Sequence, residues 1–379
     1  KIEVENDGDA LAYYSLGDTL KYGVGATPNN GGVSVARLDG QTLAAVNGSF
    51  DGQTDYTVVT DDSVSVGGID SFEVTVIFTV APSDVTTESG DCSLEPTEAG
   101  TGLLNCATAV VGDTRKEAEA CENTPGIDVS ITKTVSTEPM PTGSPNQFEM
   151  TYKIEVTNTG DALAYYSLGD TLKYGVGATP NVVSVVRLDG QSLQAVSGTF
   201  DGLGDYTIVT NDTVGVGQVD SFEVYVAFTV SPSDVTGMSG DCTLDPGENG
   251  TGLLNCATAV VGDTRKDDDA CTNIPTVDVA IRKTISSGAM PTGNPNEFTI
   301  SYKIEVENTG DALAYYSLGD TLKYGVGATP DVVSVSRLDG QTLAAVNGSF
   351  DGQTDYTVVT DDSVSVGGID SFEVTVVFT

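Results

Sequence analysis

The sequence predicts an all-β protein made of tandem antiparallel β-sandwich repeats of about 150 residues. Two observations lead to this prediction. The block Lys153–Leu172 recurs almost letter for letter from Lys1 and again from Lys303, and self-similarity at a fixed period indicates a repeat array. Around these blocks, apolar and polar residues alternate in short runs, which is the pattern of half-buried strands.

Three arginines mark the period, because Arg37, Arg187 and Arg337 are spaced 150 residues apart. A chain of 379 residues with this period holds about two and a half domains, each large enough for its own core. The first and third copies match best, since Gln41–Val76 recurs unchanged as Gln341–Val376. Near-identical copies suit a protein that needs length, whereas an enzyme has little use for them.

The domain joints are predicted from proline, because Pro125 and Pro275 each precede a fresh strand. The expected domains are a first sandwich without its opening strand, a complete second one, and a third without its C-terminal part, at residues 1–125, 126–275 and 276–379. Both ends of the sequence fall inside a repeat, which is the pattern of a window cut from a longer protein. The joints contain no Gly/Ser-rich linker, so we expect successive domains to be stiffly connected.

The strands of the middle copy are predicted in chain order from their alternation. The first spans residues 128–135, the second contains 153–157, and a later one runs through 222–230. The Asp-Gly dipeptide at 189–190 indicates a two-residue hairpin, because both turn positions need positive φ. The best helical candidate, Lys116–Ala120, is too short. We therefore expect about eight to ten strands in each repeat, packed as two sheets.

Composition narrows the classes of function. The 55 acidic and 16 basic residues give a formal net charge of −39, and such a surface repels nucleic acid and anionic lipid. No apolar run approaches the roughly 20 residues that span a bilayer, so no direct membrane insertion is expected. Histidine is absent, which removes the commonest general base and metal ligand. With no nucleophile–base pair and no phosphate loop, the sequence predicts that the protein is not an enzyme.

Four motifs in a fixed order resemble the DUF11 repeat family of bacterial and archaeal surface proteins. The motifs are Ile127–Ser136, Tyr152–Asp161, Leu168–Leu172 and Leu253–Val261. The resemblance covers the whole chain. It implies immunoglobulin-like sandwiches, related to adhesin and pilin domains, and a structural role at the cell surface or outside the cell. It implies nothing about a particular ligand.

One lysine lies in an apolar row of the first predicted strand. Lys133 shares strand parity with Val129, Ile131 and Val135, and Lys283 stands in the same place in the third copy. If these apolar residues face the core, the ammonium faces it too, which is costly without a partner. The lysine therefore needs either a partner or a path to solvent.

The resemblance to pilin-like domains suggests one resolution, an autocatalytic isopeptide bond. It offers Asn255 as the acceptor of the Lys133 amine, with Asn105 as its counterpart in the first copy, and Asp170 as the acid that shuttles protons. Two other readings stay open: a lysine that reaches solvent at a strand end, and a buried Lys–Asp ion pair. Among the three copies, only the middle one contains all three residue types within this sequence.

The cysteines predict disulfides, because no pair has the close spacing of a zinc site and no histidine assists. The preferred pairing joins Cys106 to Cys121 across the turn at 112–115, and Cys256 to Cys271 in the middle copy. This leaves Cys92 and Cys242 unpaired or bonded to a neighbouring chain. Pairing Cys92 with Cys106 is the competing choice. The preferred register has one flaw, since it sets Asp268 on a face otherwise made of alanines.

Acidic clusters and aromatic residues give weaker signals. The clusters are Asp61-Asp62, Asp241–Glu248 and Asp267–Asp269. None fits a calcium-loop pattern, so solvated faces are the ordinary reading, although carboxylates at the joints could bind calcium. Asn-Xaa-Ser/Thr sequons occur at Asn47, Asn211, Asn249 and Asn347. The pair Tyr165-Tyr166 suggests strand packing at a sandwich edge, or an aromatic patch that binds a ligand.

Together these features predict a structural protein that forms or extends an extracellular fibre, sheath, stalk or surface layer, with self-association into the assembly. The alternative is the spacer of a large adhesin whose ligand-binding tip lies outside this sequence. No cofactor is expected apart from calcium.

Overall fold

A computed structural model describes residues 1–39, 44–85, 89–94, 100–190, 195–243, 251–339 and 344–379. Every helix or strand assigned in these ranges is a β-strand, and every strand pair in them is antiparallel. The prediction of an all-β protein with tandem sandwiches is confirmed. No helix in the described part of the chain is long and apolar enough to cross a membrane.

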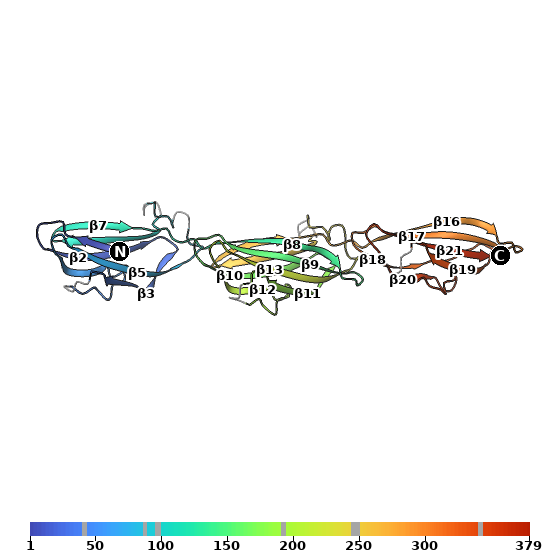
Figure 1. The fold of residues 1–379 in the computed structure, drawn as a ribbon, viewed down its shortest axis with the longest axis horizontal. Coiled ribbons are helices and arrows are strands. Elements are labelled where there is room, and N and C mark those ends of the chain that lie inside the picture. The colour runs from blue at the N-terminus through green and yellow to red at the C-terminus, as the bar shows by residue number, and fades with distance from the viewer. Residues whose placement is uncertain (40–43, 86–88, 95–99, 191–194, 244–250, 340–343) are drawn as a thin grey trace.

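The three copies form three sandwiches that follow one another in a row, so the molecule is a rod (Figure 1). The N-terminus lies in the first sandwich and the C-terminus at the far end of the third. The long axis of each sandwich runs along the rod (Figure 1). The domains therefore add length rather than bulk.

The strands repeat with the sequence. The first domain contains β1 (Ile2–Glu5), β2 (Ala12–Tyr22), β3 (Ala26–Arg37), β4 (Thr57–Val64), β5 (Ile69–Val80), β6 (Leu103–Val111) and β7 (Thr114–Ala120). The middle domain contains β8 (Val129–Pro141), β9 (Gln147–Asn158), β10 (Ala164–Tyr174), β11 (Ala178–Arg187), β12 (Thr207–Val214), β13 (Val219–Val230), β14 (Leu253–Val261) and β15 (Thr264–Ala270). The third domain contains β16 (Val279–Pro291), β17 (Phe298–Asn308), β18 (Ala314–Gly319), β19 (Pro330–Arg337), β20 (Thr357–Val364) and β21 (Ile369–Phe378).

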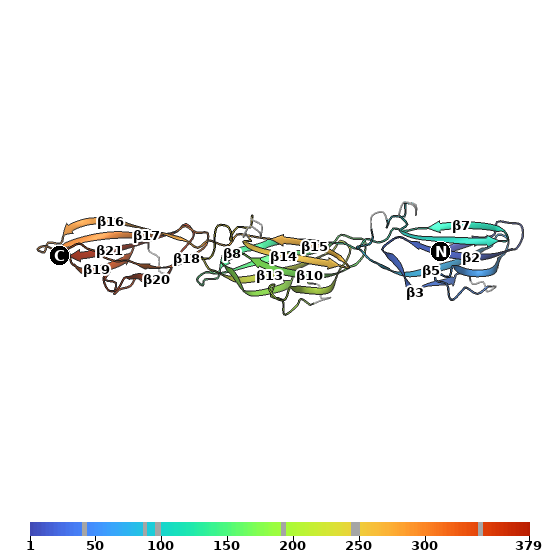
Figure 2. The same ribbon diagram turned by 180° about the vertical axis from the view of Figure 1, so that it is seen from behind.

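Two four-stranded sheets make up the middle sandwich. One has the strand order β12-β10-β14-β15 and the other β11-β13-β9-β8. Figures 1 and 2 show these sheets as two layers from opposite sides of the rod. The edge strands β8 and β15 come from different sheets but lie against each other, so this side of the sandwich is closed.

Alternation along the strands builds the core of the middle domain. On β9 every second residue from Phe148 to Val156 is buried, and β13 shows the same pattern from Asp220 to Val230. The expected strands at 153–157 and 222–230 lie inside these two elements. Their inward residues pack against Leu168 of β10 in one apolar cluster. Burial of these side chains supplies most of the stability of the sandwich.

The flanking domains repeat this arrangement as far as their residues extend. The first has the sheets β4-β2-β6-β7 and β1-β5-β3, and the third has β16-β17-β21-β19 and β18-β20. Among the described residues, nothing in the first domain takes the place that β8 has in the middle domain. Likewise, no described strand of the third domain corresponds to β14 and β15. Consequently the faces of β7 and of β16 are largely exposed.

The period-marking arginine is itself a structural element in each copy. In the middle domain, Arg187 forms ion pairs with Asp189, Asp212 and Asp220, while its guanidinium lies over the Phe222 ring. The same contacts surround Arg37 and Arg337. Because its partners come from both sheets, the arginine links the two sheets of the sandwich.

The structure differs from the sequence prediction in two places. Residues 116–120, the best helical candidate, form part of strand β7. At the Asp-Gly pair 189–190, Gly190 has φ 73°, but Asp189 is not among the described residues with positive φ, so the pair lacks the two positive φ angles that the predicted hairpin turn needs. The second arm expected at 191–193 lies outside the described residues.

Both joints are held on each side by backbone hydrogen bonds. At the first joint, Thr124 N–H donates to Gly90 O at 3.0 Å, and Asp161 N–H donates to Gly126 O at 2.7 Å. Only Pro125 separates the residue bonded to the first domain from the residue bonded to the second. The second joint repeats these contacts one period later, from Ile274 to Gly240 and from Asp311 to Thr276. The expectation of short joints agrees with this geometry.

Candidate cross-linking site

Lys133 lies in the core of the middle domain. It pairs with Ile154 across the β8–β9 ladder and shares its inward face with Val129. The residue is 4% exposed. Strand parity therefore predicted its direction correctly, and the reading of a lysine that reaches solvent is wrong for this copy.

Asp170 and Asn255 reach the same place from the opposite sheet. On the β10–β14 ladder, Leu172 pairs with Asn255 and Asp170 pairs with Ala257, so the two polar residues share one inward face. Asp170 Oδ1 accepts a hydrogen bond from Lys133 Nζ. Asp170 Oδ2 accepts one from Asn255 Nδ2 at 2.9 Å. The three residues named from the sequence thus meet on one carboxylate.

The surroundings favour uncharged forms of the lysine and the acid. Burial lowers the pKa of the Lys133 ammonium and raises the pKa of the Asp170 carboxyl. Transfer of one proton from Lys133 to Asp170 would leave a neutral amine and a neutral acid. Asn255 Oδ1 is buried and has no hydrogen-bond partner among the described residues. A protonated Asp170 could supply the missing donor.

The three side chains are of the types that an acyl transfer within the domain would need. A neutral Lys133 amine has the lone pair that attacks Cγ of Asn255, and a protonated Asp170 can polarise the carboxamide. The new amide bond forms as the C–N bond to the Asn255 nitrogen breaks. That nitrogen leaves as ammonia after taking up a proton that the Lys133 amine loses through Asp170.

Asp268 connects the site to the edge of the sandwich. Its Oδ2 accepts a hydrogen bond of 2.6 Å from the Lys133 backbone N–H. This N–H belongs to an edge strand whose other side pairs with β9. The acid therefore satisfies a backbone donor and links β15 to β8, which explains an acidic residue on an alanine face.

The other two copies hold parts of the same site. In the first domain, Asp18 and Asn105 occupy the corresponding positions on β2 and β6. Both Asp18 oxygens are buried without a hydrogen-bond partner among the described residues, and burial raises the pKa of this carboxyl to about 6. In the third domain, Lys283 donates to Asp320 at 2.5 Å, and 35% of the lysine side chain is exposed.

The predicted disulfide pairing is wrong. The structure joins Cys92 to Cys121 and Cys242 to Cys271, while Cys106 and Cys256 are free. The competing choice, Cys92 with Cys106, is also wrong.

Turn length is the physical reason for the error. The β6–β7 turn consists of two residues, 112 and 113, because Val111 pairs with Thr114. The prediction assumed a four-residue turn centred one position later, and that shift moves every pair by two residues. Cys106 therefore pairs with Glu119 rather than with Cys121. The middle copy behaves alike, with Cys256 opposite Asp269.

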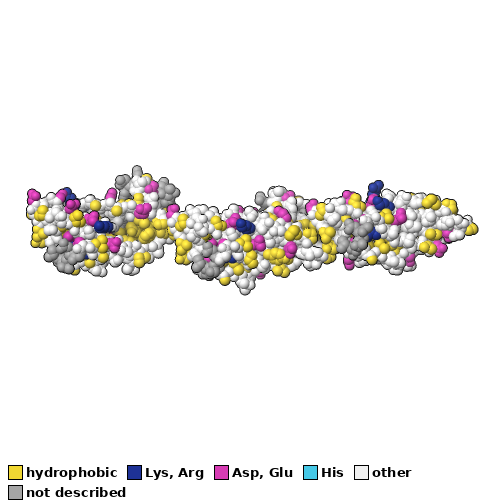
Figure 3. All heavy atoms as spheres, viewed as in Figure 1, with side chains coloured by type: hydrophobic (Ala, Val, Ile, Leu, Met, Phe, Trp, Pro, Cys, Tyr) yellow, Lys and Arg dark blue, Asp and Glu magenta, His cyan; other side chains and the backbone are white. Residues whose placement is uncertain are grey.

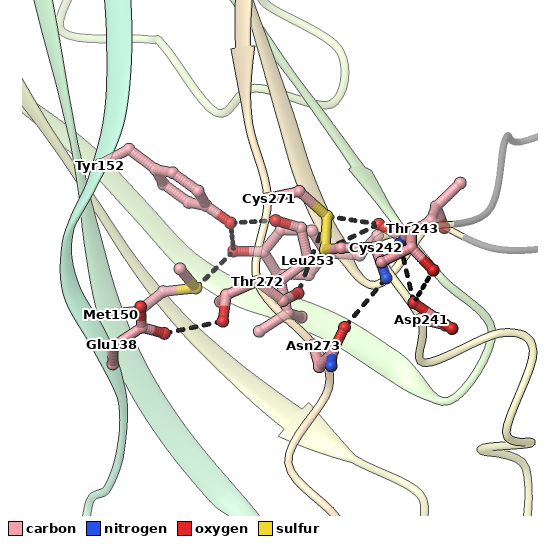
Figure 4. Close-up of a disulfide and its surroundings, with 12 residues drawn as sticks. Glu138, Met150, Tyr152, Asp241, Cys242, Thr243, Leu253, Cys271, Thr272 and Asn273 are labelled. Atoms are coloured by element: carbon pink, nitrogen blue, oxygen red, sulfur yellow. Dashed lines mark hydrogen bonds between the residues drawn. A yellow bond between two sulfur atoms is a disulfide. The ribbon is translucent and has the colours of Figure 1, made fainter.

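The middle disulfide forms a clasp at the C-terminal exit of its domain (Figure 4). Cys242 N–H donates to Asn273 Oδ1 at 3.0 Å, and Thr272 Oγ1 donates to Glu138 at 2.7 Å. Leu253 N–H donates to Thr272 O at 2.8 Å. The clasp thus joins the loop before β14 to the segment that leaves the domain.

A glycine beside the clasp was not recognised from the sequence. Gly252 has φ 46°, and a Cβ at this position would lie 2.5 Å from Cys242 Sγ. Gly102 stands in the same relation to Cys92 in the first domain. The sequence held no signal that singles out this pairing, because every pairing of the three cysteines has the same separation in both copies.

No calcium site emerges from the described residues. They contain no group of three or more acidic, cysteine or histidine side chains placed to hold a metal. Part of the acidic stretch Asp241–Glu248 and the sequon at Asn249 lie outside the described residues. On the visible face, acidic side chains are scattered over all three domains and basic ones occur at a few separate points (Figure 3).

A scan against protein-family models finds no match, and a search of the curated proteins finds none either. The geometry of the chain therefore carries the functional argument.

Proposed function

We propose that this chain is a load-bearing structural segment of an extracellular fibre, sheath, stalk or surface layer. The observation that carries the proposal is the arrangement of three sandwiches in a row, with joints that are hydrogen-bonded to both neighbouring domains. Such a chain gains length with little freedom to fold back. Two disulfides are compatible with an oxidising, extracellular setting.

Covalent cross-linking belongs to the same proposal. Lys133 and Asn255 meet on Asp170 inside the middle domain, and the pKa directions favour the neutral lysine that acyl transfer needs. An isopeptide bond there would join β8, at the entry of the domain, to β14, near its exit. We propose that the bond forms spontaneously after folding, with Asp170 as the proton shuttle.

Intact-mass measurement with and without reductant tests this proposal. The expected mass without reductant is that of the sequence less one ammonia and less four hydrogen atoms, because two disulfides are present. Reductant restores the hydrogens but leaves the ammonia loss. Asn255→Ala should abolish the ammonia loss, while Asn105→Ala, which removes the counterpart without a lysine, should leave it intact. A reduced chain with the plain mass of its sequence would sink the isopeptide.

A further inference from the structure

At the second joint, a loop of the middle domain touches the next domain. The loop between β8 and β9 contains Gly143, whose backbone oxygen accepts a hydrogen bond of 2.8 Å from Tyr315 Oη. Tyr315 lies on β18, the third strand of the third domain, at the end of that domain beside the second joint (Figure 1). Gly143 has φ 91°, a conformation that only glycine adopts easily, so the backbone path of the loop depends on glycine at this position.

Three copies of the same tyrosine allow an internal comparison. Tyr13 is 63% exposed and Tyr165 is 60% exposed, whereas Tyr315 is only partly exposed. The neighbouring leucine follows the same order, because Leu11 and Leu163 are exposed and Leu313 is not. Among the described residues of 1–125, no loop equivalent to 140–145 covers Tyr165. Where the loop is present, the Leu-Ala-Tyr segment is covered.

The apolar part of the joint supports the same contact. Ala312 is 5% exposed and belongs to the apolar core cluster of the middle domain, together with Ile274. Its counterpart at the first joint, Ala162, is only half-buried and does not belong to the core cluster of the first domain. The third domain thus packs on the second domain through both a hydrogen bond and apolar burial.

We propose that loop 140–145 is an interdomain latch, and that the Leu-Ala-Tyr segment of the following repeat is its docking surface. The latch fixes the angle between consecutive sandwiches. The partner of the latch is the next repeat of the same kind. The loop contacts the apolar Leu–Tyr edge of that repeat, and the tyrosine hydroxyl donates a hydrogen bond to the loop backbone. The inference rests on the proposed rod but needs no isopeptide bond.

Spin-label distances across the joints test the latch. In a chain with Cys106→Ser and Cys256→Ser, labels at Ser184→Cys and Ser334→Cys span the second joint from equivalent exposed positions. Labels at Ser34→Cys and Ser184→Cys span the first. The first joint has a contact of its own, between Pro82 and the β14–β15 turn at Gly262, so each variant is compared with the parent at the same joint.

Matched tyrosine variants decide the outcome. Tyr315→Phe removes only the hydrogen-bond donor, and Tyr315→Ala also removes the ring. We expect both to broaden the second-joint distribution relative to the parent, with alanine broadening it more than phenylalanine. Tyr165→Ala should leave the first joint unchanged. A second-joint distribution that is the same with and without the Tyr315 ring would overturn the latch, while the intact mass separately decides the isopeptide.

Discussion

Asp170 shows how one carboxyl can organise a buried polar site. Its two oxygens bind two different side chains, so neither Lys133 nor Asn255 enters the core without a partner for its nitrogen. Strand parity placed Lys133 inward, and the resemblance to pilin-like domains supplied Asp170 and Asn255 as its partners. The sequence could not indicate the Asp268 bond, since that contact depends on which edges of the two sheets close.

Removal of the acid should both destabilise the middle domain and block the cross-link. Asp170→Asn leaves Lys133 buried beside neutral groups, and breaking a buried pair costs about 3–5 kcal/mol. Denaturant unfolding and intact mass are the measurements. Asp320→Asn is the matched control, and its effect should be small because Lys283 reaches water. Equal losses of stability in the two variants would contradict this account.

Asp18 predicts a pH dependence for the first domain. Its pKa is raised to about 6 by burial, so folding favours the protonated form. A raised carboxyl pKa gives stability that is complete below the unfolded pKa and is lost as pH rises through the folded pKa. Between pH 4 and pH 7 the loss should be about 2 kcal/mol.

The variant Asp18→Asn isolates that contribution. It carries no charge in either state, so its first domain should lack this loss of stability on going from pH 4 to pH 7. Hydrogen exchange of β2 and β6 amides measures the first domain alone. Identical pH dependence in the parent and the variant would show that Asp18 is ionised in the fold without cost.

At the scale of elements, the β14–β15 hairpin illustrates where prediction from sequence stopped. The hairpin was predicted from its Gly-Asp turn, whereas residues 116–120 on the second arm in the first copy were the best helical candidate. The register of the hairpin could not be predicted, because replacing a four-residue turn by a two-residue turn shifts every cross-strand pair by two positions. As a result, Cys256 pairs with Asp269 across the hairpin. Cys271 forms its disulfide with Cys242, which precedes the hairpin in the chain. A contact between a loop and a strand end leaves no periodic signal.

The clasp should contribute measurably to stability. The Cys242–Cys271 disulfide closes a loop with a sequence separation of 29 residues. Loop-closure entropy for this length corresponds to about 3–4 kcal/mol. Replacing both cysteines by serine should lower the denaturant resistance of the middle domain by that amount, whereas Cys256→Ser should change little. An unchanged unfolding midpoint in the double variant would show that the clasp is dispensable.

For the whole molecule, the disulfide and the proposed isopeptide bond would together define a path for load through the middle domain. Force that enters near residue 126 would cross from Lys133 to Asn255, then through the Cys242–Cys271 ring to the exit near residue 275. Residues 134–241 would carry no load. The acidic surface adds repulsion between neighbouring rods, which favours solubility over collapse.

Stretching single chains by force tests the central claim most directly, because it measures the length that the middle domain releases. With both cross-links, only about 25 residues can extend, giving a stretched length of about 90 Å. Asn255→Ala should raise this to about 400 Å with the disulfide intact, and reductant should raise it further. If the parent chain released about 500 Å, the length of the whole domain, the account of a covalently held rod would be contradicted.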